Sequence, residues 1–268
     1  MVSLLKRGLL IAFIISIYLF ITRGSKTATI IRLAGSTAFQ PFAEKLADVY
    51  MDKNESAVID VQGGGSALGI MAVNQGIVDI GMADMLQLPR VVSHLTKVVC
   101  ARDGIAVIVH KDNPIENISK KQLQDIFTGK ITNWQKVGVS PAPLRVISRE
   151  DGSGTRKSFD QIVLKKNKLT INAMYQDSNG TIREAVKSDE NAIGYISIGF
   201  INSSVKTVDI DGINATNENV KNGKYTLARP IYLILKKDIG QDARQFIDFL
   251  LSNEAQTIIS KNGLIPVK

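Results

Sequence analysis

From residue 29 onward, short β-branched apolar runs alternate with longer segments in which apolar positions recur at helical spacing. The apolar runs predict strands over residues 29–34, 57–62 and 78–82. The segments between them predict helices over residues 39–53 and 68–75. This strand–helix–strand–helix–strand order predicts an α/β fold with a parallel or mixed sheet.

Later in the chain the pattern predicts two long buried strands on either side of a central segment. The predicted buried strands are residues 104–110 and 230–235. Between and after them we expect a helix at 119–127 with a capping box, a strand at 144–148, a helix opened by 151–155 and an amphipathic helix at 244–251. We therefore expect two lobes, with residues 28–103 and 230–268 forming the first and residues 104–229 the second.

The N-terminal segment has the pattern of an export signal. Lys6 and Arg7 precede an apolar run from Gly8 to Ile21, broken only by Ser16. A run of about 15 residues matches a signal peptide better than a membrane-spanning helix of about 20. We predict that residues 1–27 are a signal peptide or an N-terminal membrane anchor, and that the rest is periplasmic or at the cell surface. No cysteine directly follows the run, since the one cysteine is Cys100, so a lipid tether is not supported. No second apolar stretch is long enough for a channel or permease.

Charge and composition narrow the possible partners. The 268 residues carry a net charge of +8, but half of it lies in residues 1–27, and the remaining +4 is interspersed with acids. Nucleic acid would need a basic run or an aromatic-rich basic stripe, so we expect no nucleic-acid partner. One cysteine and two histidines exclude a disulfide framework and leave little room for a metal site. We predict neither a metal nor a cofactor.

Three glycine-rich turns carry the candidate chemistry. Each lies after a predicted strand and before a predicted helix: Gly35-Ser36-Thr37-Ala38, Gly63-Gly64-Gly65-Ser66-Ala67 and Asp151-Gly152-Ser153-Gly154-Thr155. Glycine allows close backbone approach, the helix N-terminus offers free N–H groups, and the hydroxyls add further donors. One such turn is usually only a turn. Three that converge would surround a small tetrahedral anion without a metal.

Two charged residues sharpen this hypothesis. Arg149 lies four residues before Ser153 and is a candidate cation for the anion, with Asp151 as its supporting partner. Asp84 ends the third predicted strand, where a carboxylate would repel an anion. It is useful there only if the ligand carries a proton that Asp84 accepts, as phosphate does near neutral pH and sulfate does not.

The chain resembles the phosphate-binding component of Pst-type ABC importers over roughly residues 28–268. The matching segments, in order, are Gly35–Thr37, Gln62–Ser66, Asp79–Met82, Phe127–Trp134, Ser148–Arg156, Asn191–Tyr195 and Gly263–Val267. The resemblance implies a type II periplasmic-binding-protein fold, in which two α/β lobes close on one phosphate about two crossover strands. It also implies the ligand set: Ser36, Thr37 and Ala38 of the first turn, Ser66, Asp84, Arg149, and the last-turn residues Ser153, Gly154 and Thr155.

We therefore expect a non-enzymatic, exported, monomeric protein that passes inorganic phosphate to the permease subunits of an importer. Another tetrahedral oxyanion (sulfate, molybdate or tungstate) is one alternative, and a sensor or scavenger without a transporter is another. A serine-type phosphatase or other hydrolase using Ser66 or Ser153 is less favoured, because it would need His94 or His110 as its base. We expect His94 to be exposed, His110 to be structural, Cys100 to be a buried filler and Trp134 to pack inside a lobe.

Overall fold

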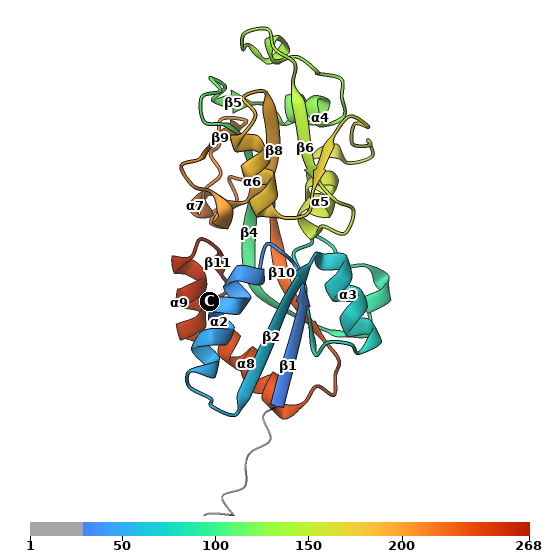
Figure 1. Cartoon of the computed structure of the whole chain (residues 1–268), viewed down its shortest axis with the longest axis vertical. Coiled ribbons are helices and arrows are strands. Elements are labelled where there is room, and N and C mark those ends of the chain that lie inside the picture. Colours follow the sequence, from blue (N-terminus) through green and yellow to red (C-terminus); the bar gives the residue numbers. More distant parts are fainter. Residues whose placement is uncertain (1–28) are drawn as a thin grey trace, which may run out of the picture.

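The computed structural model describes residues 29–268, so the expected signal peptide or anchor at residues 1–27 lies outside the described residues. Within 29–268, no helix has the length and apolar character needed to cross a bilayer. The described chain forms an elongated mixed α/β molecule with two halves, joined end to end by two strands (Figure 1).

The first half opens as the sequence predicts. Strand β1 (Thr29–Gly35) lies between β2 (Ala57–Gly64) and β3 (Ile80–Ala83) and runs parallel to both. Helix α2 (Gln40–Met51) connects β1 to β2, and α3 (Ser66–Gln75) connects β2 to β3. The predicted parallel opening is confirmed.

Two antiparallel strands complete this sheet. Strand β10 (Ala228–Leu235) pairs with β3 on one side and with β4 (Thr96–His110) on the other. Helices α8 (Gln241–Leu250) and α9 (Asn253–Lys261) follow, and the short β11 (Ile265–Pro266) returns to β4.

Strand β4 continues into the second half, where it pairs with β8 (Ala192–Ser197) and β9 (Val205–Ile210). Strand β6 (Arg145–Arg149) lies between β8 and β7 (Met174–Gln176) and pairs with both. Strand β5 (Asn117–Ile118) pairs with β9. The α-helices of this half are α4 (Lys120–Phe127), α5 (Gly154–Phe159), α6 (Asn179–Lys187) and α7 (Asn217–Lys221). Short turns of helix are η1 (Arg90–Val92, in the first half), η2 (Trp134–Val137), η3 (Asp160–Leu164) and η4 (Ile198–Phe200).

Each half has its own hydrophobic core. In the first half, Leu33, Leu46 and Phe246 are fully buried between the sheet and the helices α2, α8 and α9. In the second, Phe127 and Tyr195 are equally buried beside the continuation of β4. Within residues 29–268, the chain passes between the two cores at two places, in β4 and just before β10. There the Ile105 N–H donates to the Leu227 carbonyl at 2.7 Å.

Strand β4 differs most from the sequence prediction, because it begins at Thr96 rather than at 104. Lys97, Arg102 and Asp103 interrupt the apolar pattern of its first part. Arg102 is exposed, but Asp103 is fully buried and pairs across the strands with Arg229 of β10. The prediction therefore missed the first half of β4, because a buried, paired charge interrupts the apolar pattern used to recognise a buried strand.

Two glycines bring helix α3 close to the sheet. A Cβ on Gly69 would lie 2.4 Å from the Ala34 carbonyl oxygen, and one on Gly35 would lie 2.1 Å from that of Met82. Gly35 also has a φ of +137°, which favours glycine. This close approach sets the N-terminus of α3 beside the ends of β1 and β3, where the candidate chemistry lies.

Candidate anion-binding site

The three predicted glycine-rich turns meet where the two halves touch. Helix α2 begins after β1, α3 after β2 and α5 after β6, so all three N-termini lie at the ends of strands. The Ala67 N–H of the second turn donates to the Gly152 carbonyl of the third at 3.1 Å. The first turn meets the third through Arg149, whose Nη2 donates to Thr37 Oγ1 at 3.1 Å.

Glycine is required where the second and third turns touch. A Cβ on Gly154 would lie 2.2 Å from Ser66 Oγ and 2.6 Å from Asp84 Oδ1. Gly65 has a φ of +88°, and a Cβ there would lie 2.8 Å from the Gly152 carbonyl oxygen. Such contacts are closer than real Cβ atoms make, so the two halves approach this closely only because both positions are glycine.

Asp84 lies at the centre of this contact and is only 2 % exposed. Its Oδ1 accepts from the Ser66 hydroxyl at 2.7 Å, and its Oδ2 accepts from the Thr155 hydroxyl at 2.7 Å. Arg229 Nε donates to the same Oδ2 at 3.0 Å. We call Asp84, Ser66, Thr155 and Arg229 the Asp84 cluster. A carboxylate has about four lone-pair positions, so three are used here and about one remains for a further donor.

The partners of Asp84 keep its carboxylate ionised. Burial alone would raise the pKa of Asp84. The positive charge of Arg229 and the hydrogen bonds from the Ser66 and Thr155 hydroxyls outweigh that effect, with a smaller contribution from the nearby Ser36 hydroxyl, so the pKa is lowered below its usual value. Asp84 therefore presents an acceptor, not a donor, to anything bound beside it.

Arg149 is buried on the opposite side of the contact, with 1 % exposure. Its Nε donates to the Gln176 carbonyl at 3.2 Å, and its Nη2 donates to the Asp177 carbonyl at 2.6 Å. Its Nη1 has no hydrogen-bond partner among residues 29–268. Burial lowers the pKa of Arg149 and the charge of Asp84 opposes that shift. Since an arginine stays protonated in proteins, Nη1 is a buried cationic donor without an acceptor.

Backbone donors add to this. Among the hydrogen bonds of the described chain, none uses the N–H groups of Thr37, Ala38, Gly154 or Thr155. The side chains of Ser36 and Ser153 instead cap their own turns, accepting from Phe39 N and Arg156 N at 3.2 Å. Unused N–H groups at helix starts, next to an unpaired guanidinium nitrogen, are typical of an anion-binding site.

The expected role of Asp151 is wrong. Asp151 is exposed, and its Oδ1 pairs with Arg156 Nη1 at 2.9 Å, not with Arg149. Carbonyl groups at the end of β7 already accept hydrogen bonds from Arg149 Nε and Nη2. Arg156 completes this arrangement by donating to the Arg149 carbonyl at 2.9 Å.

Two residues of the site are not predicted from the sequence. Arg229 and Asp103 are fully buried beside Asp84, and Arg229 Nη2 lies 2.9 Å from Asp84 Oδ2 and 2.8 Å from Asp103 Oδ2. One feature of the sequence could have indicated them. A charged residue lies within or beside an apolar strand at both positions, and the two strands pair with one another. A charge in such a position is normally buried with a partner.

The other singled-out residues lie away from the site. His94 is exposed, and His110 Nδ1 accepts from the Asp112 N–H at 3.2 Å. Cys100 and Trp134 are buried, and the Trp134 indole donates to the Asn191 carbonyl at 3.0 Å. Residues 29–268 contain no group of three or more His, Cys, Asp or Glu side chains placed to hold a metal ion.

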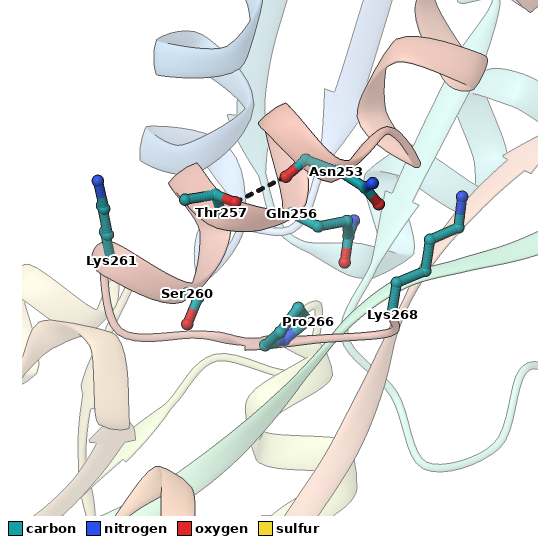
Figure 2. Close-up of a pocket in the computed structure, with 7 residues that line it drawn as sticks. All are labelled: Asn253, Gln256, Thr257, Ser260, Lys261, Pro266 and Lys268. Atoms are coloured by element: carbon teal, nitrogen blue, oxygen red, sulfur yellow. Dashed lines mark hydrogen bonds between the residues drawn. The ribbon is translucent and has the colours of Figure 1, made fainter.

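The surface has a hollow beside α9 and the C-terminal residues (Figure 2). Gln256 lines it, but its amide donates to the Cys100 and Leu250 carbonyls and accepts from the Val267 N–H at 2.8 Å. The Thr257 hydroxyl donates to the Asn253 carbonyl within the helix. The Gln256 amide therefore links the C-terminal segment to β4 and α8.

Comparison with known proteins agrees with this architecture. Residues 22–254 match the PBP superfamily domain. The phosphate-binding protein PstS of Bacillus subtilis is 32 % identical over 251 residues, covering 90 % of this chain and 82 % of that protein. A Clostridium perfringens protein, assigned as a phosphate ABC transporter substrate-binding protein and solved with bound phosphate, is 41 % identical. Its TM-score is 0.87, and the match covers 90 % of this chain and all of that one. An ABC-type phosphate transport receptor from Vibrio cholerae is 30 % identical with a TM-score of 0.76, over 89 % of this chain and all of that one.

The fold and the anion-binding geometry define a solute-binding protein of the periplasmic-binding-protein superfamily, and the chain belongs to that superfamily. Within it, the chain belongs to the family of Pst-type phosphate-binding components. The family resemblance and the fold class expected from the sequence are confirmed.

Proposed function

We propose that this protein captures one inorganic phosphate ion between its two halves and delivers it to an ABC importer. The observation that carries this proposal is the buried Arg149 Nη1, which has no partner among the described residues and lies at the contact between the halves. The PstS relatives and the phosphate-bound Clostridium structure support phosphate as the ion.

The proposed binding mode uses the residues expected from the sequence, apart from Asp151. Arg149 and the free N–H groups of Ala38, Gly154 and Thr155 meet the negative charge. The hydroxyls of Ser36, Thr37, Ser66 and Ser153 add donors, some by giving up their present partners. Asp84 accepts the proton that phosphate retains, using its remaining lone pair. Sulfate has no such proton and would place an oxygen against a carboxylate, so the site selects against it.

We propose that the two crossover strands act as a hinge between two lobes. Residues 28–103 and 230–268 form the first lobe, and residues 104–229 form the second. The contact between Ala67 and Gly152 belongs to the closed arrangement and would break on opening. Closure excludes water and immobilises the ion, and the importer must supply the free energy to reopen the lobes. No chemical step is needed, and neither histidine contacts Ser66 or Ser153 in the described hydrogen bonds.

The cellular setting follows from the same proposal. The importer's permease subunits are the expected protein partner, the protein acts as a monomer, and neither a nucleic acid nor a cofactor takes part. Residues 1–27 direct export and are either cleaved or kept as an anchor, so the protein works outside the cytoplasmic membrane.

Calorimetric titration of purified residues 28–268, stripped of bound ligand, tests this proposal. We expect one-to-one binding of phosphate and no measurable heat with sulfate. Equal binding of both would contradict the role of Asp84 and leave the oxyanion open, with molybdate and tungstate to be titrated next. Binding of no oxyanion would overturn the proposal, and turnover of a chromogenic phosphate ester would replace it with a hydrolase.

A further inference from the structure

Arg229 touches both halves of the molecule from within the hinge region. It lies in the second position of β10, directly opposite Asp103 of β4, where β4 leaves the first sheet for the second. From there its guanidinium reaches Asp84, which follows β3, and Thr155, which lies in the first turn of α5. Its side chain has no exposed surface.

The contacts of Arg229 converge on one oxygen of Asp84. Nε and Nη2 lie 3.0 and 2.9 Å from Asp84 Oδ2. Nη2 also lies 3.0 Å from Thr155 Oγ1, and the Thr155 hydroxyl donates to that same Oδ2. The arginine thus supports both the carboxylate and the hydroxyl that joins it from the other half.

Asp103 is the second acid beside this arginine, and its situation is the reverse of that of Asp84. Asp103 Oδ2 lies 2.8 Å from Arg229 Nη2, but neither of its oxygens meets hydrogen-bond geometry with any described residue. Burial raises the pKa of Asp103 to about 6, against the charge of Arg229. Arg229 therefore donates a hydrogen bond to Asp84 and forms a close ion pair with Asp103 on the neighbouring strand.

We infer that Arg229 is a positioning residue for phosphate recognition: it keeps the Asp84 carboxylate ionised and oriented as a proton acceptor, and through Thr155 it links that state to closure. This inference rests on the proposed function, because selection between phosphate and sulfate depends on an ionised Asp84. Without Arg229, burial dominates at Asp84 and favours its protonated form. A protonated Asp84 is a donor, so it no longer distinguishes a protonated oxyanion from a bare one.

The ionisation of Asp84 is measured directly in the full chain without ligand, by following its ¹³C-labelled carboxyl carbon by NMR as a function of pH. We expect Arg229→Gln to raise the pKa of Asp84 by about one unit or more. Arg102→Gln is the matched control, since Arg102 lies on the same crossover and is exposed, so it should leave the titration unchanged. An Asp84 pKa that is the same in Arg229→Gln and in the unmodified protein overturns the inference.

Calorimetry with phosphate and with sulfate supplies the second readout. We expect Arg229→Gln to lower the ratio of phosphate to sulfate affinity by about tenfold, the free-energy equivalent of one pKa unit. Arg229→Lys keeps the charge but loses the planar fork, so it should recover part of that ratio. A ratio in Arg229→Lys and Arg229→Gln that stays within about twofold of the unmodified protein contradicts the inference.

The two readouts separate this inference from the proposed function. If the unmodified protein binds no phosphate but Arg229→Gln still shifts the Asp84 titration, the proposed function fails and the control of Asp84 by Arg229 is upheld. If phosphate binds and neither readout changes, only the inference fails. Should Arg229→Gln not fold, Arg229→Lys with the same two measurements decides the question.

Discussion

The two sides of the candidate site are opposites in how their charges are satisfied. On one side, both oxygens of Asp84 accept hydrogen bonds, and a fully buried arginine neutralises the carboxylate. On the other, Arg149 is held by two backbone carbonyls and Thr37, yet its Nη1 is left without an acceptor. The Asp84 carboxylate is therefore largely satisfied within the protein, whereas the cationic side lacks an anion.

This difference separates affinity from selectivity. A buried cationic donor with no partner is costly until an anion arrives, so Arg149 contributes to binding any oxyanion. Asp84 has about one acceptor position left, so it favours an anion that carries a proton over one that does not. Loss of the cationic side should weaken binding of all oxyanions, and loss of the acidic side should change only which one is preferred.

The largest effect is expected from removing the cation. Arg149→Met keeps much of the apolar volume but loses the charge-assisted hydrogen bonds. Phosphate affinity should fall by roughly 100- to 1,000-fold, from about 3–4 kcal/mol of lost interaction. Calorimetry measures the loss. Arg145→Met, on the same strand but paired at the surface with Asp189, is the control and should bind as the unmodified protein does.

A smaller effect follows from holding the two sides apart. Gly154→Ala places a Cβ 2.2 Å from Ser66 Oγ, so closure must shift one of the turns. We expect phosphate affinity to fall by roughly 10- to 100-fold, in line with overpacking costs of about 1–3 kcal/mol. Gly152→Ala, whose Cβ would meet only Ala67 Cβ at 3.9 Å, is the control. Equal losses in both variants would show that the steric contact is not the cause.

Asp84→Asn changes the acidic side alone. The amide keeps an acceptor oxygen but has no negative charge, and its NH₂ group can donate to an unprotonated oxyanion. We expect the ratio of phosphate to sulfate affinity to fall by about tenfold, with a smaller change in phosphate affinity itself. Competition of sulfate against bound phosphate provides the measurement. If the ratio in Asp84→Asn is unchanged, Asp84 does not act as the proton acceptor.

A separate prediction concerns stability and pH, not ligand binding. Burial raises the pKa of Asp103 to about 6, so between about pH 4 and 6 the folded protein holds a proton that the unfolded chain releases. Stability should therefore fall as pH rises through that window and stay lower above it, by up to about 3 kcal/mol. Asp103→Asn should flatten this part of the profile. Chemical unfolding at pH 4.5 and 7 measures it, and a profile as steep in Asp103→Asn as in the unmodified protein would contradict the assignment.

The elements that could be predicted from sequence are those with an uninterrupted apolar pattern. The opening strands and helices, the capping box at Ser119 and the apolar part of β10 follow from local periodicity and cap chemistry alone. The three turns were predictable too, because glycine and hydroxyl residues between a strand and a helix mark a helix start. What their spacing does not give is that they converge, since that depends on how the halves meet.

Residues that act through partners distant in sequence were harder to find. Asp103 and Arg229 are 126 positions apart, and each one alone weakens the strand prediction around it. Asp151 was wrongly assigned as the partner of Arg149 because the two residues are close in sequence. The actual partners of Arg149 are the backbone carbonyls of residues 176 and 177, which are distant in sequence, and Asp151 pairs with Arg156 instead. Charge pairs of this kind are set by strand register, which one sequence does not reveal.

The order of strands in the first sheet, β2-β1-β3-β10-β4, has a consequence for the order in which the two halves fold. Strand β10 lies between β3 and β4 but is made only after the whole second half has been completed. The second half is one continuous stretch and can acquire its core before residues 228–235 join the first sheet. The first half must keep β3 and β4 apart until residues 228–235 emerge, so its slow, non-local closure comes last. Because Arg229 belongs to that same strand, the Asp84 cluster can form only after β10 has entered the sheet.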